Sequence, residues 1–184
     1  MIVVEGADNT GKSTLIDKLL AGDPSLRLLK RERFKPGMEG TIGRTHVDAL
    51  LPPNEDLRAH ANSVSDRTFF SECIYGPIFR GGCRMTTAEH FELYALFRTY
   101  PMLIIWCDTA DEVIRATWAK RTQLYDRDPL LIAEAYRRRL PQLARGYLVF
   151  RYDWTCDPHN ALVEKLLSWH RDLLNQSTFA LRCP

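Results

Sequence analysis

The feature that most constrains the fold is a glycine-rich motif close to the N-terminus. Residues 6–13, Gly-Ala-Asp-Asn-Thr-Gly-Lys-Ser, match the phosphate-binding pattern GxxxxGK[ST] in every defined position. The apolar run of residues 1–4 precedes the motif and predicts a buried strand, and residues 12–20 follow at helical spacing. The motif therefore stands between a strand and a helix, where its backbone N–H groups can surround an anion beside the helix N-terminus.

The residues of this loop have separate predicted roles. Gly6 and Gly11 permit the sharp curvature of the backbone. Lys12 is expected to reach the β- and γ-phosphates of ATP, and the Ser13 hydroxyl is a candidate ligand of Mg²⁺. Thr14 is either a further nucleotide contact or an ordinary residue of the first helical turn. The predicted nucleotide-binding residues are Gly6, Ala7, Asp8, Asn9, Thr10, Gly11, Lys12, Ser13 and Thr14.

Apolar runs alternate with helical patterns along the rest of the chain. Further strands are predicted at residues 26–30, 63–66, 102–107 and 147–152. Helix starts are indicated by the capping-box pairs Thr86/Glu89 and Thr109/Glu112 and by the Asp-Pro pairs 128–129 and 157–158. The third of these helices should end or kink at Pro141, and residues 32–53 are typical of a loop with short helical pieces. We expect an α/β fold, with a five-stranded parallel sheet covered by helices on both faces.

Composition narrows the class of protein. A chain of 184 residues with 45% hydrophobic and 26% charged residues has the balance of one globular domain, residues 1–184. The net charge of +2 gives no strong field for nucleic acid or a membrane surface, and no apolar run approaches ~18 residues. Five scattered cysteines without a CxxC pair, and no signal-peptide pattern, favour reduced thiols in a cytoplasmic protein. The five histidines show no metal-ligand spacing and are assigned no role.

Residues 4–14, Val-Glu-Gly-Ala-Asp-Asn-Thr-Gly-Lys-Ser-Thr, resemble the EGxDxxGKST loop of thymidylate kinases. Asp66-Arg67 at a predicted strand end, followed by Ser71 and Tyr75-Gly76, resembles the DR segment of that family. The resemblance implies the nucleoside monophosphate kinase fold, in which five parallel strands carry helices on both sides and a mobile lid. It places an acceptor-binding region at about residues 32–85 and the lid at about residues 119–130.

The resemblance also implies roles for residues outside the loop. Arg67 would grip the acceptor monophosphate, and Asp66 would orient the acceptor or the water shell of Mg²⁺. Glu5 would lie near the transferred phosphate and the metal as a substrate-binding residue, and the alternative is that it anchors the loop by hydrogen bonds. An aromatic ring and an arginine after the DR pair could stack on and bond a base. The candidates are Phe70, Tyr75 and Arg80. Core packing is the alternative, and it is the interpretation we prefer for Phe70 taken alone.

Because the phosphate loop carries no arginine, the resemblance implies that the lid supplies the positive charge for phosphoryl transfer. Guanidinium groups match the transferred phosphoryl group in charge and shape. The candidates are Arg121 and Arg127 as catalytic residues, Arg115 as a nucleotide contact, and Lys120. A solvated helix face is the alternative for this set, and it is the interpretation we prefer for residues 137–139. Asp108, after the strand of residues 102–107, is either a metal ligand through water or has no such role.

The sequence thus predicts an ATP-dependent kinase of a (deoxy)nucleoside monophosphate such as dTMP, using Mg²⁺. No NKxD guanine-reading motif follows a strand, which argues against a regulatory GTPase. The expected partner is the nucleoside monophosphate substrate, with no membrane or nucleic acid, and a homodimer is left open. Two alternatives stand beside this: a P-loop kinase of a hydroxyl on a modified base in DNA or on a small metabolite, and a non-catalytic nucleotide-binding module.

Overall fold

The computed structural model describes residues 1–29, 42–50, 60–120, 127–156 and 159–180, with the backbone alone for residues 159 and 177–180. Its strands are β1 (Ile2–Gly6), β2 (Arg27–Leu29), β3 (Ser63–Asp66), β4 (Leu103–Cys107) and β5 (Leu148–Tyr152). All neighbouring strands pair in parallel, in the order β2-β3-β1-β4-β5. The predicted five-stranded parallel sheet is confirmed.

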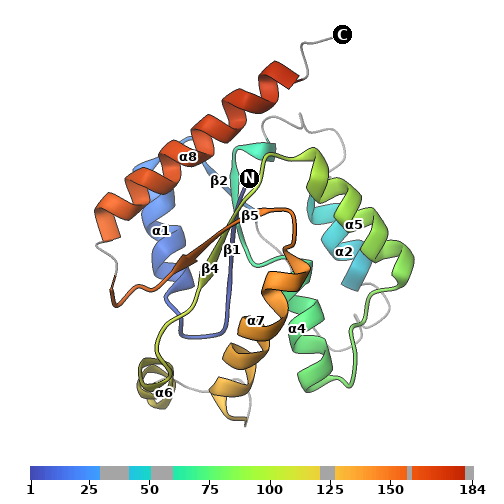
Figure 1. Cartoon of the computed structure of the whole chain (residues 1–184), viewed down its shortest axis with the longest axis vertical. Helices are drawn as coiled ribbons and strands as arrows, with labels where there is room; N and C mark the ends of the chain where they lie inside the picture. The colour runs from blue at the N-terminus through green and yellow to red at the C-terminus, as the bar shows by residue number, and fades with distance from the viewer. Residues whose placement is uncertain (30–41, 51–59, 121–126, 157–158, 181–184) are drawn as a thin grey trace.

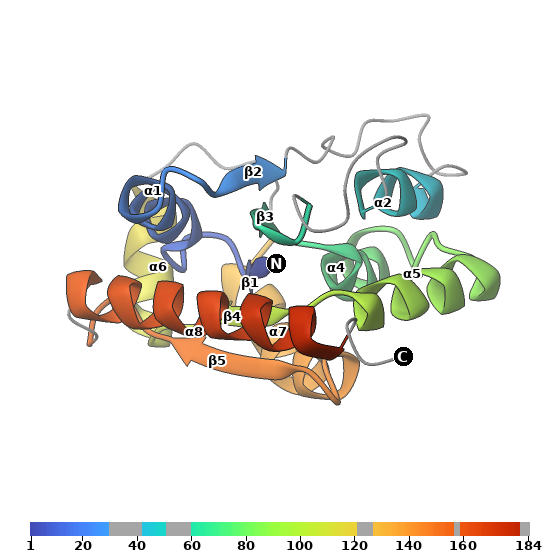
Figure 2. The same ribbon diagram turned by 90° about the horizontal axis from the view of Figure 1, so that it is seen from above.

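Helices cover both faces of this sheet. They are α1 (Lys12–Gly22), α2 (Ile42–Leu50), α4 (Phe69–Phe79), α5 (Thr87–Thr99), α6 (Asp111–Ala119), α7 (Pro129–Leu143) and α8 (His159–Ala180). Figure 1 shows α1 and α8 together on one side of the sheet, with α4 and α7 on the other. In the view of Figure 2, α2 and α5 lie side by side beyond α4. None of the described helices is long and apolar enough to cross a membrane.

The alternating direction of side chains in the central strands divides the core in two. Ile2 and Val4 of β1 are completely buried in the cluster that β1 shares with α1 and α8. Val3 points the other way, into the cluster with α4 and α7, as does its register partner Ile104 of β4. Burying a side chain of this size contributes roughly 1.5–3 kcal/mol. A register slip of one residue would exchange the two faces, so these strands have one stable pairing.

Two of the predicted helix starts are confirmed. At the start of α5, the Glu89 N–H donates to Thr86 Oγ1 at 3.2 Å while the Glu89 carboxylate accepts from the Thr86 N–H at 2.7 Å. At the start of α7, Asp128 accepts a hydrogen bond from the Leu130 N–H at 3.0 Å. Both caps satisfy N–H groups that have no partner inside the helix.

The predicted Thr109/Glu112 capping box is wrong. Helix α6 begins after Ala110, without a side-chain cap. The Thr109 hydroxyl instead donates to the carboxylate of Asp153 at 2.9 Å. A tertiary contact between the ends of two neighbouring strands thus replaces the local contact that the spacing suggests.

Three further expectations have mixed outcomes. Helix α7 continues two residues past Pro141, to Leu143. Of the predicted loop at residues 32–53, the structure describes residues 42–50, which form α2. The Asp157-Pro158 pair lies outside the described residues, and α8 is described from His159.

Candidate active site

The strand order places the candidate site at the carboxyl edge of the sheet. β1 lies between β3 and β4, and the chain passes directly from β1 into the phosphate-binding loop. Asp66 ends β3 in register with Val4, so it lies at the same edge as this loop. In open α/β sheets the carboxyl ends of the strands, at the point where the strand order reverses, are where ligands bind.

The loop backbone is shaped as anion binding requires. Gly6 has φ 142° and Gly11 has φ 85°, and a Cβ on Gly6 would come within 2.3 Å of the Cys107 carbonyl oxygen. Gly11 is also the N-cap residue of α1, and no side chain caps this helix. The first N–H groups of α1 therefore remain available to an anion at the positive end of the helix dipole.

Lys12 lies against this loop. Its ammonium group donates a hydrogen bond to the Ala7 carbonyl oxygen, and the residue is 8% exposed. Burial, followed by repulsion from the nearby Arg67 guanidinium, lowers the pKa of Lys12 to about 8. The Thr10 hydroxyl also donates to Ala7, at 2.8 Å, and Thr10 is buried. Thr10 therefore braces the loop through its side chain.

Ser13, Thr14 and Asp66 are exposed at this edge. Asp66 is close enough to Lys12 for its charge to act on the pKa of the lysine. A hydroxyl and a carboxylate oxygen are the hard ligands that Mg²⁺ prefers, and Mg²⁺ retains several waters beside a few protein ligands. Ser13 and Asp66 thus offer the ligand types that Mg²⁺ prefers, and their predicted role in holding the ion stays a prediction.

Arg67 connects the phosphate loop to helix α4. Its guanidinium forms an ion pair with Asp8 and donates a hydrogen bond to the Tyr75 hydroxyl at 2.8 Å. The guanidinium carbon also lies 4.7 Å from the centroid of the Tyr75 ring. The Arg67 backbone has φ 68° and its N–H donates to the Val4 carbonyl oxygen at 2.9 Å. A non-glycine residue in the left-handed region is uncommon, and such residues cluster at functional sites.

Glu5 is fully buried behind the loop. One carboxylate oxygen accepts from the Thr68 N–H at 2.7 Å and the Thr68 hydroxyl at 2.8 Å. The other accepts from the hydroxyls of Ser71 at 2.8 Å and Tyr136 at 3.0 Å. Glu5 thus ties β1 to α4 and α7, the arrangement expected of an anchoring residue, and its predicted contact with substrate stays a prediction.

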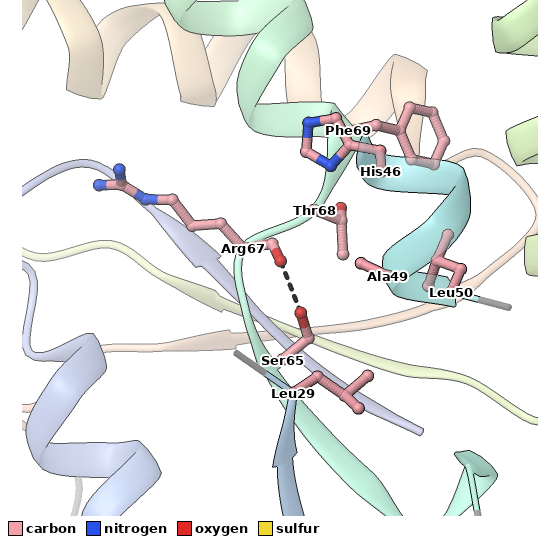
Figure 3. Close-up of a pocket in the computed structure, with 8 residues that line it drawn as sticks. All are labelled: Leu29, His46, Ala49, Leu50, Ser65, Arg67, Thr68 and Phe69. Carbon is pink, nitrogen blue, oxygen red and sulfur yellow. Dashed lines mark hydrogen bonds between the residues drawn. The ribbon is translucent and has the colours of Figure 1, made fainter. Parts of the chain in front are cut away.

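A pocket lies between α2 and the carboxyl ends of β2 and β3 (Figure 3). Arg67 contributes to both this pocket and the phosphate-binding loop. Its backbone lines the pocket, with its carbonyl oxygen accepting from Ser65 Oγ at 2.7 Å, while its side chain points away toward the phosphate loop. The lining is mostly apolar. The lining residues are Leu29, His46, Ala49, Leu50, Ser65, Arg67, Thr68 and Phe69.

Two predicted base contacts are placed elsewhere. Phe70 is completely buried among the aromatic rings of the core, including Phe97 with ring centroids 5.5 Å apart. This corrects the prediction that Phe70 contacts a base. Arg80 forms an ion pair with Glu72, and the Glu72 carboxylate also accepts from the Arg84 N–H at 3.1 Å. In this arrangement Arg80 fixes the loop after α4.

The lid prediction falls partly outside the described residues, which exclude Arg121. Arg127, which precedes α7, is exposed, and its guanidinium carbon lies 5.5 Å from the centroid of the Phe79 ring. Arg115 of α6 pairs with Asp128 at 3.2 Å across exposed surface. Lys120 is exposed at the end of α6. Arg115 thus contacts Asp128 in the predicted lid segment, whereas Arg127 contacts Phe79 of α4.

Sequence reasoning missed two features. Arg137 is not on a solvated face: it donates to Asp108 at 3.0 Å and to Asp111 at 2.7 Å. Asp108 also pairs with Arg151 at 2.8 Å and is buried, so it serves as the centre of an arginine network. Trp154, which follows β5, packs against the phosphate loop, because a Cβ on Gly11 would lie 2.8 Å from its ring. The sequence signal that could have identified Trp154 is its position two residues after the last predicted strand.

No protein-family model and no curated protein matches this sequence. Solved structures do match. YorR from Bacillus subtilis, in complex with phosphorylated GDP, superimposes with a TM-score of 0.64 at 18% identity, covering 91% of this chain and 93% of YorR. Deoxyadenosine kinase from M. mycoides, with the products dCMP and dCDP, superimposes with a TM-score of 0.59 at 13% identity, covering 94% and 98% of the two chains. The chain shares the fold of these two proteins. At these identities the likeness establishes the fold alone.

Proposed function

We propose that this chain is an ATP-dependent kinase whose acceptor is a (deoxy)nucleoside monophosphate, such as dTMP, which it converts to the diphosphate. The observation that carries the proposal is the position of Arg67. Its guanidinium lies beside the phosphate loop in contact with Asp8, while its backbone lines the neighbouring pocket. An arginine at the junction of a donor site and an acceptor pocket is suited to bind a phosphate that is shared between them.

The pairing of Arg67 with Asp8 supports a phosphorylated acceptor. The Asp8 carboxylate accepts hydrogen bonds from the Arg67 guanidinium and, at 3.2 Å, from the Tyr75 hydroxyl. These two donors therefore already bind an anionic group. A phosphate oxygen makes the same kinds of contact and carries more charge than the carboxylate. An acceptor that offers only a hydroxyl has no group to match this guanidinium.

Each residue of the site then has a separate role in phosphoryl transfer. The loop N–H groups and Lys12 bind the phosphates of ATP. Ser13 and Asp66 would hold Mg²⁺, which when bound offsets the negative charge of those phosphates. An oxygen of the acceptor phosphate attacks the γ-phosphorus of ATP, and the bond to the β–γ bridging oxygen breaks with its electron pair passing to ADP. Arg67 and a lid arginine such as Arg127 balance the charge on the transferred group.

Acceptor chemistry separates this proposal from its alternatives. Deoxyadenosine kinase, one of the proteins of similar fold, is named for an acceptor that is a nucleoside. The alternatives for this chain are therefore a hydroxyl acceptor, whether on a nucleoside, a small metabolite or a modified base in DNA, and binding of nucleotide without transfer.

The test is a transfer assay on the full chain with ATP and Mg²⁺. The acceptor panel contains the deoxynucleoside monophosphates, the matching deoxynucleosides and an oligonucleotide with a hydroxymethylated base, with products separated by anion-exchange chromatography. We expect a diphosphate from at least one monophosphate, and far less of it from Lys12→Ala. Transfer only to hydroxyl acceptors would contradict the proposed acceptor. ATP binding without transfer to any acceptor would favour the nucleotide-binding module.

A further inference from the structure

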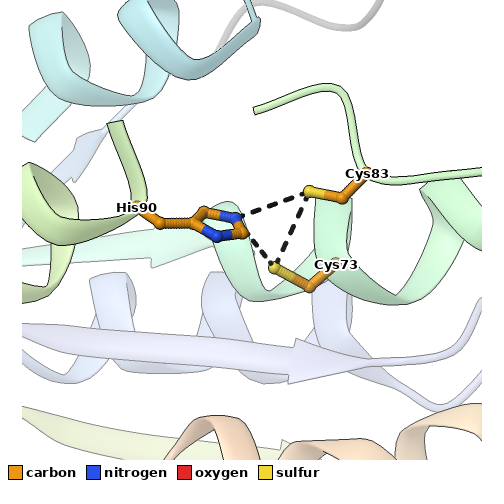
Figure 4. Close-up of side chains that lie close together, drawn as sticks. All are labelled: Cys73, Cys83 and His90. Atoms are coloured by element: carbon orange, nitrogen blue, oxygen red, sulfur yellow. Dashed lines mark hydrogen bonds between the residues drawn. The ribbon is translucent and has the colours of Figure 1, made fainter. Parts of the chain in front are cut away.

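Three side chains that the phosphate site does not use converge beside α4. Cys73 lies on α4, Cys83 in the loop that follows it, and His90 in the first turns of α5 (Figure 4). The Sγ atoms of Cys73 and Cys83 are 4.0 Å apart, and His90 Nε2 lies 3.5 Å from each of them. Two sulfur atoms and an imidazole nitrogen thus form a triangle with sides of 3.5–4.0 Å.

The spacing of these three atoms matches the face of a tetrahedron around zinc. With Zn–S bonds of about 2.3 Å and Zn–N bonds of about 2.05 Å, tetrahedral angles give S–S separations of about 3.8 Å and S–N separations of about 3.6 Å. The observed separations of 4.0 Å and 3.5 Å therefore need only a small adjustment. A disulfide would need the sulfur atoms to approach to about 2.05 Å.

Independent features hold each of the three side chains in place. The helix positions Cys73, and Tyr75, two residues on, projects from a different side of α4 toward Arg67. The Glu72 carboxylate fixes the loop that delivers Cys83, because it binds Arg80 and the Arg84 N–H. The capping box at the start of α5 fixes the turn that carries His90. A site whose ligands are fixed separately requires little reorganisation to bind a metal.

We propose that Cys73, Cys83 and His90 bind one zinc ion, with water as the fourth ligand. Two thiolates and an imidazole are soft ligands that favour zinc over magnesium or calcium. Binding releases the two thiol protons to solvent, and the resulting Zn²⁺–dithiolate unit is neutral, which suits a site where Cys73 is 5% exposed. Zinc at this position would fasten the loop after α4, and the start of α5, to α4 itself.

The site is independent of phosphoryl transfer, so its test does not use kinase activity. The full chain, purified under reducing conditions without chelator, is analysed for metal by mass spectrometry. The metal-free protein is then titrated with Co²⁺, whose absorption reports thiolate ligands and tetrahedral geometry. We expect one zinc per chain, Co²⁺ bands of tetrahedral sulfur coordination, and a melting temperature that rises when zinc is added to the metal-free protein.

Matched variants separate this site from adventitious binding. Cys83→Ser and His90→Ala, both at partly exposed positions, should each lose the bound zinc and the zinc-dependent rise in melting temperature. Cys156→Ser, at an exposed cysteine near the end of β5, should retain both. Wild-type protein with no zinc and no Co²⁺ bands would overturn the proposal, and so would zinc that all three variants retain. A Cys73–Cys83 disulfide in protein that takes up neither metal would also overturn it.

Discussion

Arg67 and Asp8, which are 59 residues apart, form an ion pair that joins the segment after β3 to the phosphate-binding loop. The same guanidinium nitrogen also donates to the Tyr75 hydroxyl, so α4 is part of the contact. The Arg67 side chain is 16% exposed and that of Asp8 is 31% exposed. A partly buried arginine with an exchangeable carboxylate partner is what a phosphate-binding site needs, because the anion can replace the carboxylate without leaving the guanidinium unpaired.

The first prediction concerns the acceptor. Arg67→Ala should lower kcat/KM for the acceptor about 10- to 150-fold, which corresponds to the loss of about 1.5–3 kcal/mol of charged hydrogen bonding. ATP affinity should change little, because the donor phosphates are held by the loop and Lys12. Steady-state kinetics with each substrate varied in turn measure both effects.

Two variants control this experiment. Arg145→Ala removes an exposed arginine from the turn after α7 and should leave both kinetic parameters near wild type. Arg67→Lys keeps the charge but not the fork of donors, so it should restore activity only in part. A loss confined to ATP binding would remove Arg67 from the acceptor side and weaken the proposed function.

The second prediction concerns pH and nucleotide binding. Burial lowers the pKa of Lys12 to about 8 in the free protein. Bound phosphates raise this pKa, because they favour the charged ammonium group. The nucleotide affinity should therefore be constant below about pH 8 and should fall by up to about tenfold per pH unit above it. Titration calorimetry between about pH 7 and pH 10 measures this slope.

Lys12 variants assign the slope to this residue. Lys12→Arg keeps a positive charge throughout this pH range and should abolish the slope. Lys12→Ala should fold normally, bind ATP weakly without the slope, and lose most of the turnover. Near-normal turnover in a well-folded Lys12→Ala protein would contradict the assignment of the phosphate loop.

Most of the fold could be predicted from sequence because its signals are local. The apolar residues 102–107 have few alternatives to a buried strand, and the GxxxxGKS motif requires a strand before it and a helix after it. The capping box at Thr86 and Glu89 is complete within four residues, so its spacing was sufficient. The similar pair at Thr109 failed because Asp153, which is 44 residues away, takes the threonine hydroxyl.

The site was less predictable, because tertiary contacts decide which members of a motif face a ligand. Sequence reasoning placed Arg67 next to the phosphate site, and the structure brings it to Asp8. Sequence reasoning also offered Phe70 as a base contact. The direction of a helical side chain changes by about 100° from one residue to the next, and the side chain of Phe70 points into the core. Cys73, Cys83 and His90 have irregular sequence spacing and meet only through the packing of α4, its following loop and α5.

The third prediction concerns Glu5, whose carboxylate accepts four hydrogen bonds from Thr68, Ser71 and Tyr136. Glu5→Ala leaves the Thr68 N–H and hydroxyl without this acceptor, whereas the Ser71 and Tyr136 hydroxyls, 2.7 Å apart, can still bond to each other. It should lower the free energy of unfolding by about 3 kcal/mol. Glu5→Gln keeps the shape and one carbonyl acceptor, and the Ser71 and Tyr136 hydroxyls can accept from its amide. It should therefore cost about 1–2 kcal/mol. Urea unfolding measures both changes.

The kinetics of Glu5→Gln distinguish anchoring from chemistry. If Glu5 acts as an anchor, kcat should remain within about tenfold of wild type while stability falls. A kcat lower by about 10³-fold with unchanged stability would instead place the carboxylate at the transferred phosphate.

The last prediction concerns the lid. The phosphate loop has no arginine, and Arg127 lies over Phe79, whose ring stacks on Tyr75 with centroids 5.9 Å apart. This row of side chains leads from Arg127 through Phe79 and Tyr75 to Arg67. We therefore propose that Arg127 can move toward the transferred group when the proposed lid closes. Arg127→Ala should lower kcat at least ~10²-fold with little change in melting temperature, because the side chain is exposed.

Arg121→Ala tests the other candidate lid arginine, and Arg138→Ala, on the exposed side of α7, is the control for both. If Arg121, Arg127, Arg115 and Lys120 each tolerate alanine with kcat within a few-fold of wild type, the segment is an ordinary charged surface. The charge for transfer would then have to come from Arg67 or from a partner subunit.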